Sequence, residues 1–283
     1  MCLIFRKSKK YYLYKSTNMK QIYILLIALL MGLSAKAESS GTCGANLTWH
    51  LTDDGVLTIT GTGKMDNYLY SVAPWYYRDV KQIIIGDGVT TIGQAAFRNR
   101  GSLTSVTIPN SVTEIGFRAF EDCRALTSIN IPNSVTEIGD YAFYNCSELT
   151  SVTIPNSVTR IGDLAFSGCR SLKNFTFGSG LRSIGQGAFS DCFNITQISS
   201  EAVVPPICDS GAFYGINKYK CKLIVPKNRL HSYQWAYQWG DFLLIEGSTT
   251  LGITNTVYNN SGLADVNTID GTKRLSKAST DEI

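Results

Sequence analysis

The chain has 283 residues, of which 44% are apolar, 17% charged and 11% aromatic. This composition excludes a wholly disordered chain, because disordered proteins combine high charge with few aromatic side chains. It also excludes a membrane protein with several spans, since only one apolar run is long enough to matter. The length is enough for one large domain or two ordinary ones.

Residues 1–37 have the pattern of a secretory signal peptide. Met19 and Lys20 precede an apolar run at residues 22–33, and small residues follow, so we expect cleavage after Ala37. The residues before Met19 indicate either translation from an upstream start or a long positive leader. Residues 1–37 contain seven basic residues and no acidic one, which leaves 19 basic and 22 acidic residues and a net charge of −3. Because the mature chain is slightly acidic, we expect no nucleic acid partner. We also expect no transmembrane span in the mature chain, since the apolar run is removed with the leader.

Residues 38–80 are predicted to form an N-terminal β-hairpin cap. Segments 47–51 and 56–59 are its expected strands, joined by a turn at residues 53–55. We expect Trp75 to lie behind the hairpin and to cover the first repeat unit. Five aromatic residues of this cap are an alternative binding surface for a protein or sugar, although most are expected to pack inside it: Tyr68, Tyr70, Trp75, Tyr76 and Tyr77.

Residues 81–195 are five successive copies of a 23-residue repeat. The second and third copies, at residues 104–126 and 127–149, agree at 15 of 23 positions. One unit of this length cannot bury its apolar residues alone, but stacked units share a continuous core. Apolar residues recur in register from copy to copy, as in the column formed by Phe97, Phe120, Phe143, Phe166 and Phe189. The sequence therefore predicts a mainly β solenoid.

Each unit is predicted to contain two short strands and a helical turn. In the third copy, residues 127–131 read as a strand with Ile129 and Ile131 inward. Pro132 then turns the chain, residues 135–138 form a second extended piece, and Gly139 permits a bend. Residues 142–146 are predicted to form a helical turn that places Phe143 in the core.

The C-terminal part of the chain is predicted to close the solenoid. Residues 196–246 are interpreted as an irregular last repeat and a C-terminal cap. Within it, Asn228 is expected to N-cap a short helix that runs to about Trp239. Residues 247–283 form a polar tail, which is either part of a sorting segment or a disordered terminus.

The repeat resembles the BspA-type leucine-rich repeat family of bacterial surface proteins. The resemblance rests on the LxxLxL-like stretch at residues 126–131, followed by Ile-Pro-Asn-Ser-Val and by Ala-Phe-x-x-Cys at residues 142–146. The opening residues 43–65 and the closing residues 223–242 are also similar to that family, so the resemblance covers about residues 41–246. It implies a leucine-rich repeat fold and a secreted or surface-exposed bacterial protein, often linked to adhesion and protein–protein contact.

The cysteines and histidines do not indicate catalytic or metal chemistry. Four cysteines recur with the repeat and are interpreted as small core residues: Cys123, Cys146, Cys169 and Cys192. Cys208 and Cys221 lie off this register and form a possible disulfide. His50 and His231 are far apart in the sequence and lack a nucleophile motif. We therefore expect no enzyme, no catalytic residue, no metal site and no cofactor.

The candidate binding surface is the outward side of the first strand of each repeat. We call it the strand face, and it consists of Ser105, Thr107, Ser128, Asn130, Ser151, Thr153, Asn174 and Thr176. Solenoids present such surfaces to partners, although exposed strands also use Ser and Thr simply because these residues suit strands. We predict a monomeric, extracellular or outer-surface binding protein, with adhesion or host-protein interaction as its first function. A carbohydrate-binding or scaffolding component of the cell envelope is the alternative.

Overall fold

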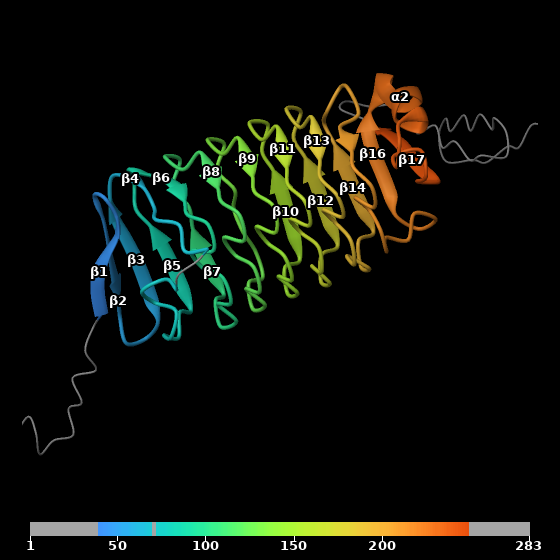
Figure 1. The fold of residues 1–283 in the computed structure, drawn as a ribbon. Coiled ribbons are helices and arrows are strands. Elements are labelled where there is room, and N and C mark those ends of the chain that lie inside the picture. Colours follow the sequence, from blue (N-terminus) through green and yellow to red (C-terminus); the bar gives the residue numbers. More distant parts are fainter. Residues whose placement is uncertain (1–38, 70–71, 249–283) are drawn as a thin grey trace, which may run out of the picture. The chain divides into compact units, whose positions relative to one another are not determined.

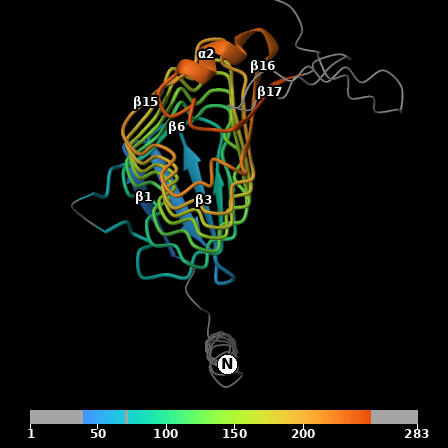
Figure 2. The same cartoon turned by 90° about the vertical axis from the view of Figure 1, so that its right-hand side faces the viewer.

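The computed structural model describes residues 39–69 and 72–248, which form an elongated stack of turns around one core (Figures 1 and 2). The predicted signal peptide lies outside the described residues. So do Tyr70 and residues 249–283 of the predicted tail. The predicted fold class, a β solenoid with two strand segments per repeat, is confirmed.

Three sheets run along the solenoid, and the pairing within the repeats is parallel. The first has the strand order β1 (Ser39–Gly44), β2 (Leu47–Leu51), β3 (Val56–Gly61), β5 (Gln82–Ile85) and β7 (Ser105–Thr107). The second has the order β10 (Ser151–Ile154), β12 (Asn174–Phe177), β14 (Gln197–Ser200), β16 (Lys222–Pro226) and β17 (Leu244–Ser248). The third is built from shorter pieces: β4 (Gly63–Lys64), β6 (Val89–Ile92), β8 (Glu114–Ile115), β9 (Glu137–Ile138), β11 (Arg160–Ile161), β13 (Ser183–Ile184) and β15 (Ile207–Cys208).

The first two sheets are separated at the third repeat. Residues 127–131 were predicted to be a strand, but only Ser128 pairs there, in a single bridge to Ser151. The alternation of the segment still follows the prediction, since Ile129 is buried and Ser128 and Asn130 are exposed. The core pattern therefore holds where the hydrogen-bonded ladder is interrupted.

The N-terminal cap is a three-stranded antiparallel sheet joined to the solenoid. β2 and β3 form the predicted hairpin, and β1 adds to the outer edge of β2. β3 then pairs in parallel with β5, so the hairpin continues directly into the first repeat. The small polar residues of β1 gave no strand signal in the sequence; β1 is held by its pairing with β2.

The core is a column of stacked aromatic rings that runs through the repeats. Neighbouring phenylalanines lie 5.1–5.9 Å apart between ring centroids, with interplanar angles of 3–26°. Trp75 begins the column 5.6 Å from Phe97, and Trp239 packs edge-on against Phe213 at the other end. Each cap thus covers the last exposed ring with an indole, as the terminal units of a repeat array require.

The segment that follows the repeat glycine is a chain of tight turns and not a helical turn. Tyr141, Phe143 and Asn145 donate their backbone N–H groups to carbonyls of the next unit at 2.7–2.8 Å. Tyr141 and Asn145 have φ angles of 57° and 59°, in the left-handed region that L-residues rarely adopt. Hydrogen bonds between units hold this strained backbone in place. We call these turns, at residues 94–99, 117–122, 140–145, 163–168, 186–191 and 210–215, the turn ridge.

The C-terminal cap contains the short helices η1 (Lys227–Arg229) and α2 (Leu230–Trp235) between β16 and β17 (Figure 1). The predicted helix is therefore shorter than expected. Arg229 occupies the N-cap position of α2, without a side-chain hydrogen bond, so Asn228 does not cap it. The buried Tyr233 of α2 bonds Ser200 Oγ at 2.7 Å and donates to the carbonyl of Ala202 at 2.9 Å.

Candidate functional site: the strand face and the turn ridge

The strand face is an array of short polar side chains on β7, β10 and β12 and on the third-repeat segment between β7 and β10. Seven of its eight residues are exposed, and Thr176 is half-buried. Ser151 lies opposite Asn174 and Thr153 opposite Thr176, because β10 and β12 pair in register. The same two rows continue onto Gln197 and Ser199 of β14. Adjacent rungs lie about 4.8 Å apart, so the hydroxyl and amide groups repeat at that interval.

The fold does not use the polar groups of the strand face. Among the described residues, none of its eight side chains takes part in a hydrogen bond within the chain. Threonines elsewhere in the repeat differ, since Thr136 and Thr150 donate their hydroxyls to carbonyls of the preceding unit at 3.3 and 3.2 Å. Some threonines of the repeat therefore stabilise the stack, whereas those of the strand face leave their hydroxyls available to a partner.

The strand face carries no charge, and its ends are marked by a change of chemistry. Lys222 of β16 and Glu246 of β17 form an ion pair of 3.0 Å beyond its C-terminal end. Ile84 of β5 and Leu244 of β17 are each a little over one-third exposed in the same two rows. A partner that covers the central rungs would therefore meet hydrogen-bonding groups and few charges.

The aromatic residues of the N-terminal cap serve mainly as core. Trp75 is fully buried, and its indole N–H donates to the carbonyl of Ala96 at 2.8 Å. Tyr68 and Tyr76 are half-buried, and burial raises the pKa of the Tyr68 hydroxyl well above its usual value. Of the four candidates that the structure describes, Tyr77 alone is largely exposed, with 86% of its surface accessible. Tyr70 lies outside the described residues, and the other three candidates offer little exposed aromatic surface.

Arg100 anchors the aromatic cap and was not singled out in the sequence. Its Nη1 donates to the carbonyls of Trp75, Tyr76 and Arg78 at 2.7–3.1 Å, and its guanidinium lies 5.0 Å from the Tyr76 ring centroid. The next four repeats have cysteine at the same position. The repeat alignment therefore contained the signal. Arginine stands in the first repeat where later repeats have cysteine, and the first repeat is preceded by an irregular loop in place of another repeat.

The repeated cysteines form a buried ladder of weak hydrogen bonds. Each thiol donates to the carbonyl of the column phenylalanine in the preceding unit, at 3.2–3.4 Å. Burial raises the pKa of Cys123 and of Cys192 to about 12, so both remain protonated at neutral pH. This agrees with their interpretation as core residues. Cys208, in β15, and Cys221, directly before β16, are also buried, and each is a free thiol.

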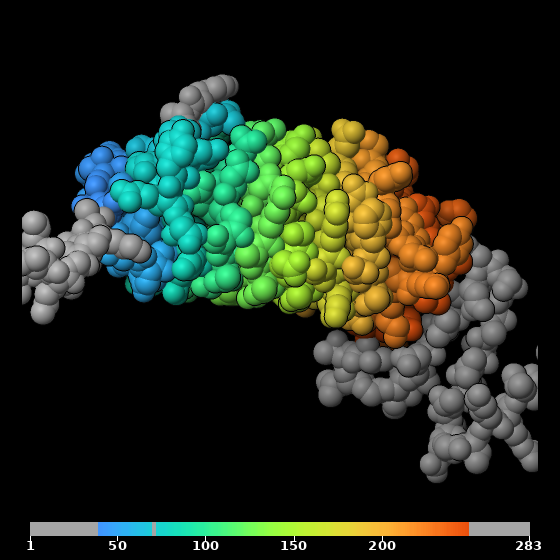
Figure 3. Space-filling view, turned by 90° about the horizontal axis from the view of Figure 1, so that it is seen from below, coloured from blue at the N-terminus to red at the C-terminus, as the bar shows by residue number. Residues whose placement is uncertain are grey.

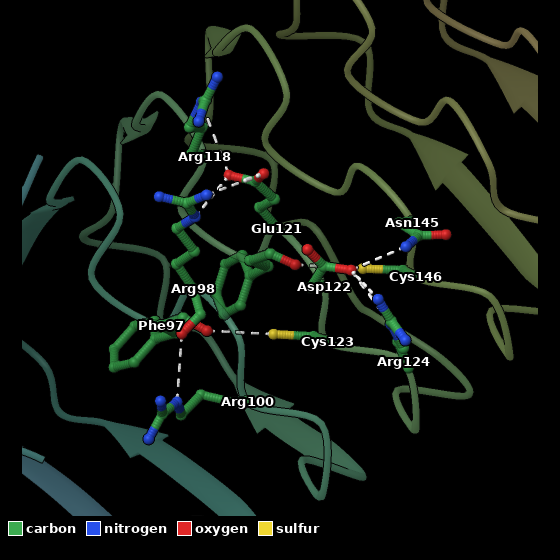
Figure 4. Close-up of polar contacts among 11 residues, drawn as sticks. Phe97, Arg98, Arg100, Arg118, Glu121, Asp122, Cys123, Arg124, Asn145 and Cys146 are labelled. Atoms are coloured by element: carbon green, nitrogen blue, oxygen red, sulfur yellow. Dashed lines mark hydrogen bonds and ion pairs between the residues drawn. The ribbon is translucent and has the colours of Figure 1, made fainter. Parts of the chain in front are cut away.

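A cluster of ion pairs lies on the turn ridge, between the first and second repeats (Figure 4). Glu121 is almost fully buried and lies 2.9 Å from Arg98 Nε and 3.6 Å from Arg118 Nε. Burial raises the pKa of Glu121, and the two arginines only partly offset this effect. Arg118 also lies between two rings, 4.9 Å from the centroid of Phe117 and 4.8 Å from that of Tyr141. Sequence reasoning missed this cluster because its members occupy variable positions of different repeats.

The described residues contain no group of three or more histidine, cysteine or acidic side chains that could hold a metal ion. His50 lies on β2 and His231 on α2, so they belong to opposite caps. Within 39–69 and 72–248, no helix is long and apolar enough to cross a membrane. The repeat units instead form a continuous exposed surface in chain order (Figure 3).

A comparison with protein-family models identifies the repeat. A model of the BspA type leucine rich repeat region matches residues 73–196 and 136–263, with six copies. No curated protein matches. The solved structures that resemble this chain include a leucine-rich repeat protein from Eubacterium ventriosum, with 26% identity, 68% of this chain and 67% of the other covered, and a TM-score of 0.45.

Two further structures have similar values. A leucine rich repeat protein from T. pallidum has 27% identity over 56% of this chain and 81% of its own, with a TM-score of 0.41. A leucine-rich repeat protein from Bacteroides ovatus has 24% identity over 66% and 55%, with a TM-score of 0.48. Because the repeat model covers well over half of its residues, this chain belongs to the BspA type leucine-rich repeat family.

Proposed function

We propose that this chain is a secreted or cell-surface protein without enzymatic activity, which binds an extracellular protein through the strand face. The observation that carries the proposal is the set of side chains that the fold leaves unused. Short hydroxyl and amide side chains lose little conformational entropy when a partner immobilises them. Eight of them in two registered rows offer many hydrogen bonds on one side of a rigid support.

Further observations support this function. The leader-like sequence at residues 1–37 and the membership of this repeat family both favour export to the cell surface. The two histidines lie in opposite caps, which disfavours a shared hydrolytic site. The array of repeats is short, so display of many copies on one surface would increase the overall affinity.

The aromatic cap gives weaker support to the alternative, a carbohydrate-binding or scaffolding component of the cell envelope. Trp75 has both its ring and its N–H engaged inside the protein. The rings of Tyr76 and Tyr77 meet at an interplanar angle of 86°, so they do not form a flat platform for a sugar. The cap is therefore the less favoured of the two predicted binding surfaces.

The test is binding of the full chain to immobilised collagen, laminin and fibronectin by surface plasmon resonance. A double variant, Ser128→Arg with Ser151→Arg, places two long cations in the centre of the strand face. Ser210→Arg is the matched control, because Ser210 is equally exposed but lies on the turn ridge. We expect binding to at least one protein, reduced at least tenfold by the double variant and unchanged by the control. Equal binding by all three chains would contradict the proposal.

A further inference from the structure

The turn ridge contains an open groove of about 440 Å³ that spans the third to the sixth repeat. It exists because of a change at one repeat position. Arg118, Tyr141 and Leu164 hold this position in the left-handed conformation, with φ of 53–57°. Gly187 and Gly211 take it in the next two units with nearly the same backbone, at φ of 58° and 66°. Because the two glycines have no side chain at this position, the surface of the ridge is recessed there and the groove forms.

Tyrosine rings stand at the two ends of this groove. Tyr141 is held in place by the guanidinium of Arg118, 4.8 Å from its ring centroid, and by the ring of Tyr144 at 5.6 Å. Tyr214, at the other end, has 69% of its surface exposed. Both tyrosines line the groove. A pyranose ring has apolar C–H faces that pack on such rings, while the tyrosine hydroxyl remains available for hydrogen bonds.

Oriented polar groups line the groove between the tyrosines. Asp163 Oδ1 accepts the backbone N–H of Gln186 at 2.8 Å, and Asp140 Oδ1 accepts that of Asp163 at 2.9 Å. Each unit therefore fixes the carboxylate of the unit before it. Within the described part of the chain, Asp163 Oδ2 has no hydrogen-bond partner, and Gln186 and Ser210 are exposed beside it. A fixed carboxylate beside an exposed amide and an exposed hydroxyl suits a ligand that carries several neighbouring hydroxyls.

We propose that this groove binds an uncharged oligosaccharide. Asp140 is paired with Arg160 Nη2 at 2.9 Å, and the carboxylate of Asp163, which forms no ion pair among the described residues, makes the site negative. A negative site disfavours uronic acids and sulfated sugars. Three steps between repeats correspond to about 14 Å, the length of a short stretch of sugar rings and more than a single sugar needs. The volume lies within the ordinary range for small-molecule sites. The site shares no residue with the strand face, so it stands or fails independently of the function proposed above.

The experiment is saturation-transfer NMR and calorimetry on the full chain with three named probes: maltotriose, xylotriose and N,N′,N″-triacetylchitotriose. Trigalacturonate is the anionic comparison. We expect at least one neutral probe to bind with a Kd between roughly micromolar and millimolar. Trigalacturonate should bind at least tenfold more weakly. Ser128→Arg, on the strand face, should leave sugar binding unchanged.

Three variants test the walls and the polar lining separately. Gly187→Leu fills the groove with the residue that Leu164 already places at this position one unit earlier. Tyr214→Ala removes an exposed ring. Asp163→Asn keeps the backbone hydrogen bond, since Asn67 Oδ1 already accepts the N–H of Gln94 at 2.8 Å in this way. Each variant should weaken the sugar at least tenfold while the unfolding midpoint of Tyr214→Ala and Asp163→Asn stays unchanged.

Two results would overturn the proposal. The first is the absence of binding by all three neutral probes at a concentration of about ten millimolar. The second is binding that Tyr214→Ala and Asp163→Asn leave unaltered, since a sugar held elsewhere does not respond to these residues. A loss caused by unfolding is distinguished by the midpoint, so a failed Gly187→Leu variant does not decide the matter alone.

Discussion

The strand face and the turn ridge are built by the same repeat, yet their side chains vary from unit to unit to different degrees. On the strand face, each unit presents the same kind of side chain, as in Ser128 and Ser151. On the turn ridge, the position of Tyr141 is held by alanine, arginine, tyrosine, leucine and glycine in successive repeats. The ridge backbone is fixed by hydrogen bonds between units, so its side chains vary without loss of the fold. A periodic backbone can therefore display one uniform surface and one individual surface.

The largest expected effect is the difference in stability loss between a core substitution and a substitution on the strand face. Phe143→Ala removes one ring from the stacked column and should cost about 3–5 kcal/mol in the free energy of unfolding, because the neighbouring rings cannot close the cavity. Ser128→Arg should change the same quantity by less than about 0.5 kcal/mol, as surface substitutions usually do. Urea unfolding followed by circular dichroism measures both. A loss of several kcal/mol in Ser128→Arg would mean that the strand face is structural.

The next effect concerns the first repeat, where Arg100 replaces the cysteine of later units. Arg100→Met removes the hydrogen bonds to the carbonyls of Trp75, Tyr76 and Arg78. The carbonyl of Trp75 keeps the backbone N–H of Arg78, whereas the part-buried carbonyls of Tyr76 and Arg78 lose their donor. We expect a loss of about 2–3 kcal/mol and faster proteolysis at residues 75–78. Arg170→Met is the control, because Arg170 is exposed. Equal stability of the two variants would show that the anchor contributes nothing.

The thiol ladder predicts a weakness at alkaline pH. The pKa of Cys123 is about 12 in the folded chain against an ordinary value of 9.0, so the folded state retains a proton that the unfolded state releases. The thiol's contribution is fully present below pH 9 and is lost as the pH rises from 9 toward 12. Above pH 9, Cys123→Ala should lose stability less steeply than the unaltered chain, by about 1.4 kcal/mol per pH unit. Urea unfolding at several pH values measures the free energy of unfolding of both chains. If it fell with pH at the same rate in both, the thiol would be exposed and the prediction wrong.

The smallest effect compares two threonines that differ in use. Thr136 donates its hydroxyl to the carbonyl of Thr113, whereas Thr153 of the strand face has no partner within the described residues. Thr136→Val should therefore cost about 0.5–1 kcal/mol and Thr153→Val almost nothing. Thermal unfolding of the two isosteric variants gives the difference directly. The reverse order would remove the main support for the strand face as a binding surface.

Much of the fold could be predicted because the core repeats in the sequence. Phe143 and Ile129 recur in columns, and a buried column leaves little choice of architecture. The turn ridge could not be predicted in the same way. Tyr141 has no turn propensity, and its left-handed backbone follows from a hydrogen bond to a unit 22 residues later. Local propensity favoured a helical turn there, and contact between units overrode it.

The candidate sites follow the same division. The strand face was visible because its residues recur at a fixed interval with Ile129 and its equivalents. The groove was not, because Tyr141, Asp163 and Tyr214 share no motif and meet only when the units stack. Arg100 was partly predictable. The repeat alignment places it at a core position, but its hydrogen-bond partners belong to an irregular loop that does not repeat.

The most direct test of two separate binding surfaces is a crossed measurement on three chains. The unaltered chain, the Ser128→Arg and Ser151→Arg double variant, and Ser210→Arg are assayed by calorimetry against the protein and the trisaccharide that bind best. We predict that the double variant loses the protein and keeps the sugar, and that Ser210→Arg does the opposite. If one folded variant lost both ligands, or neither variant lost any, the assignment of separate roles to the two faces would be wrong.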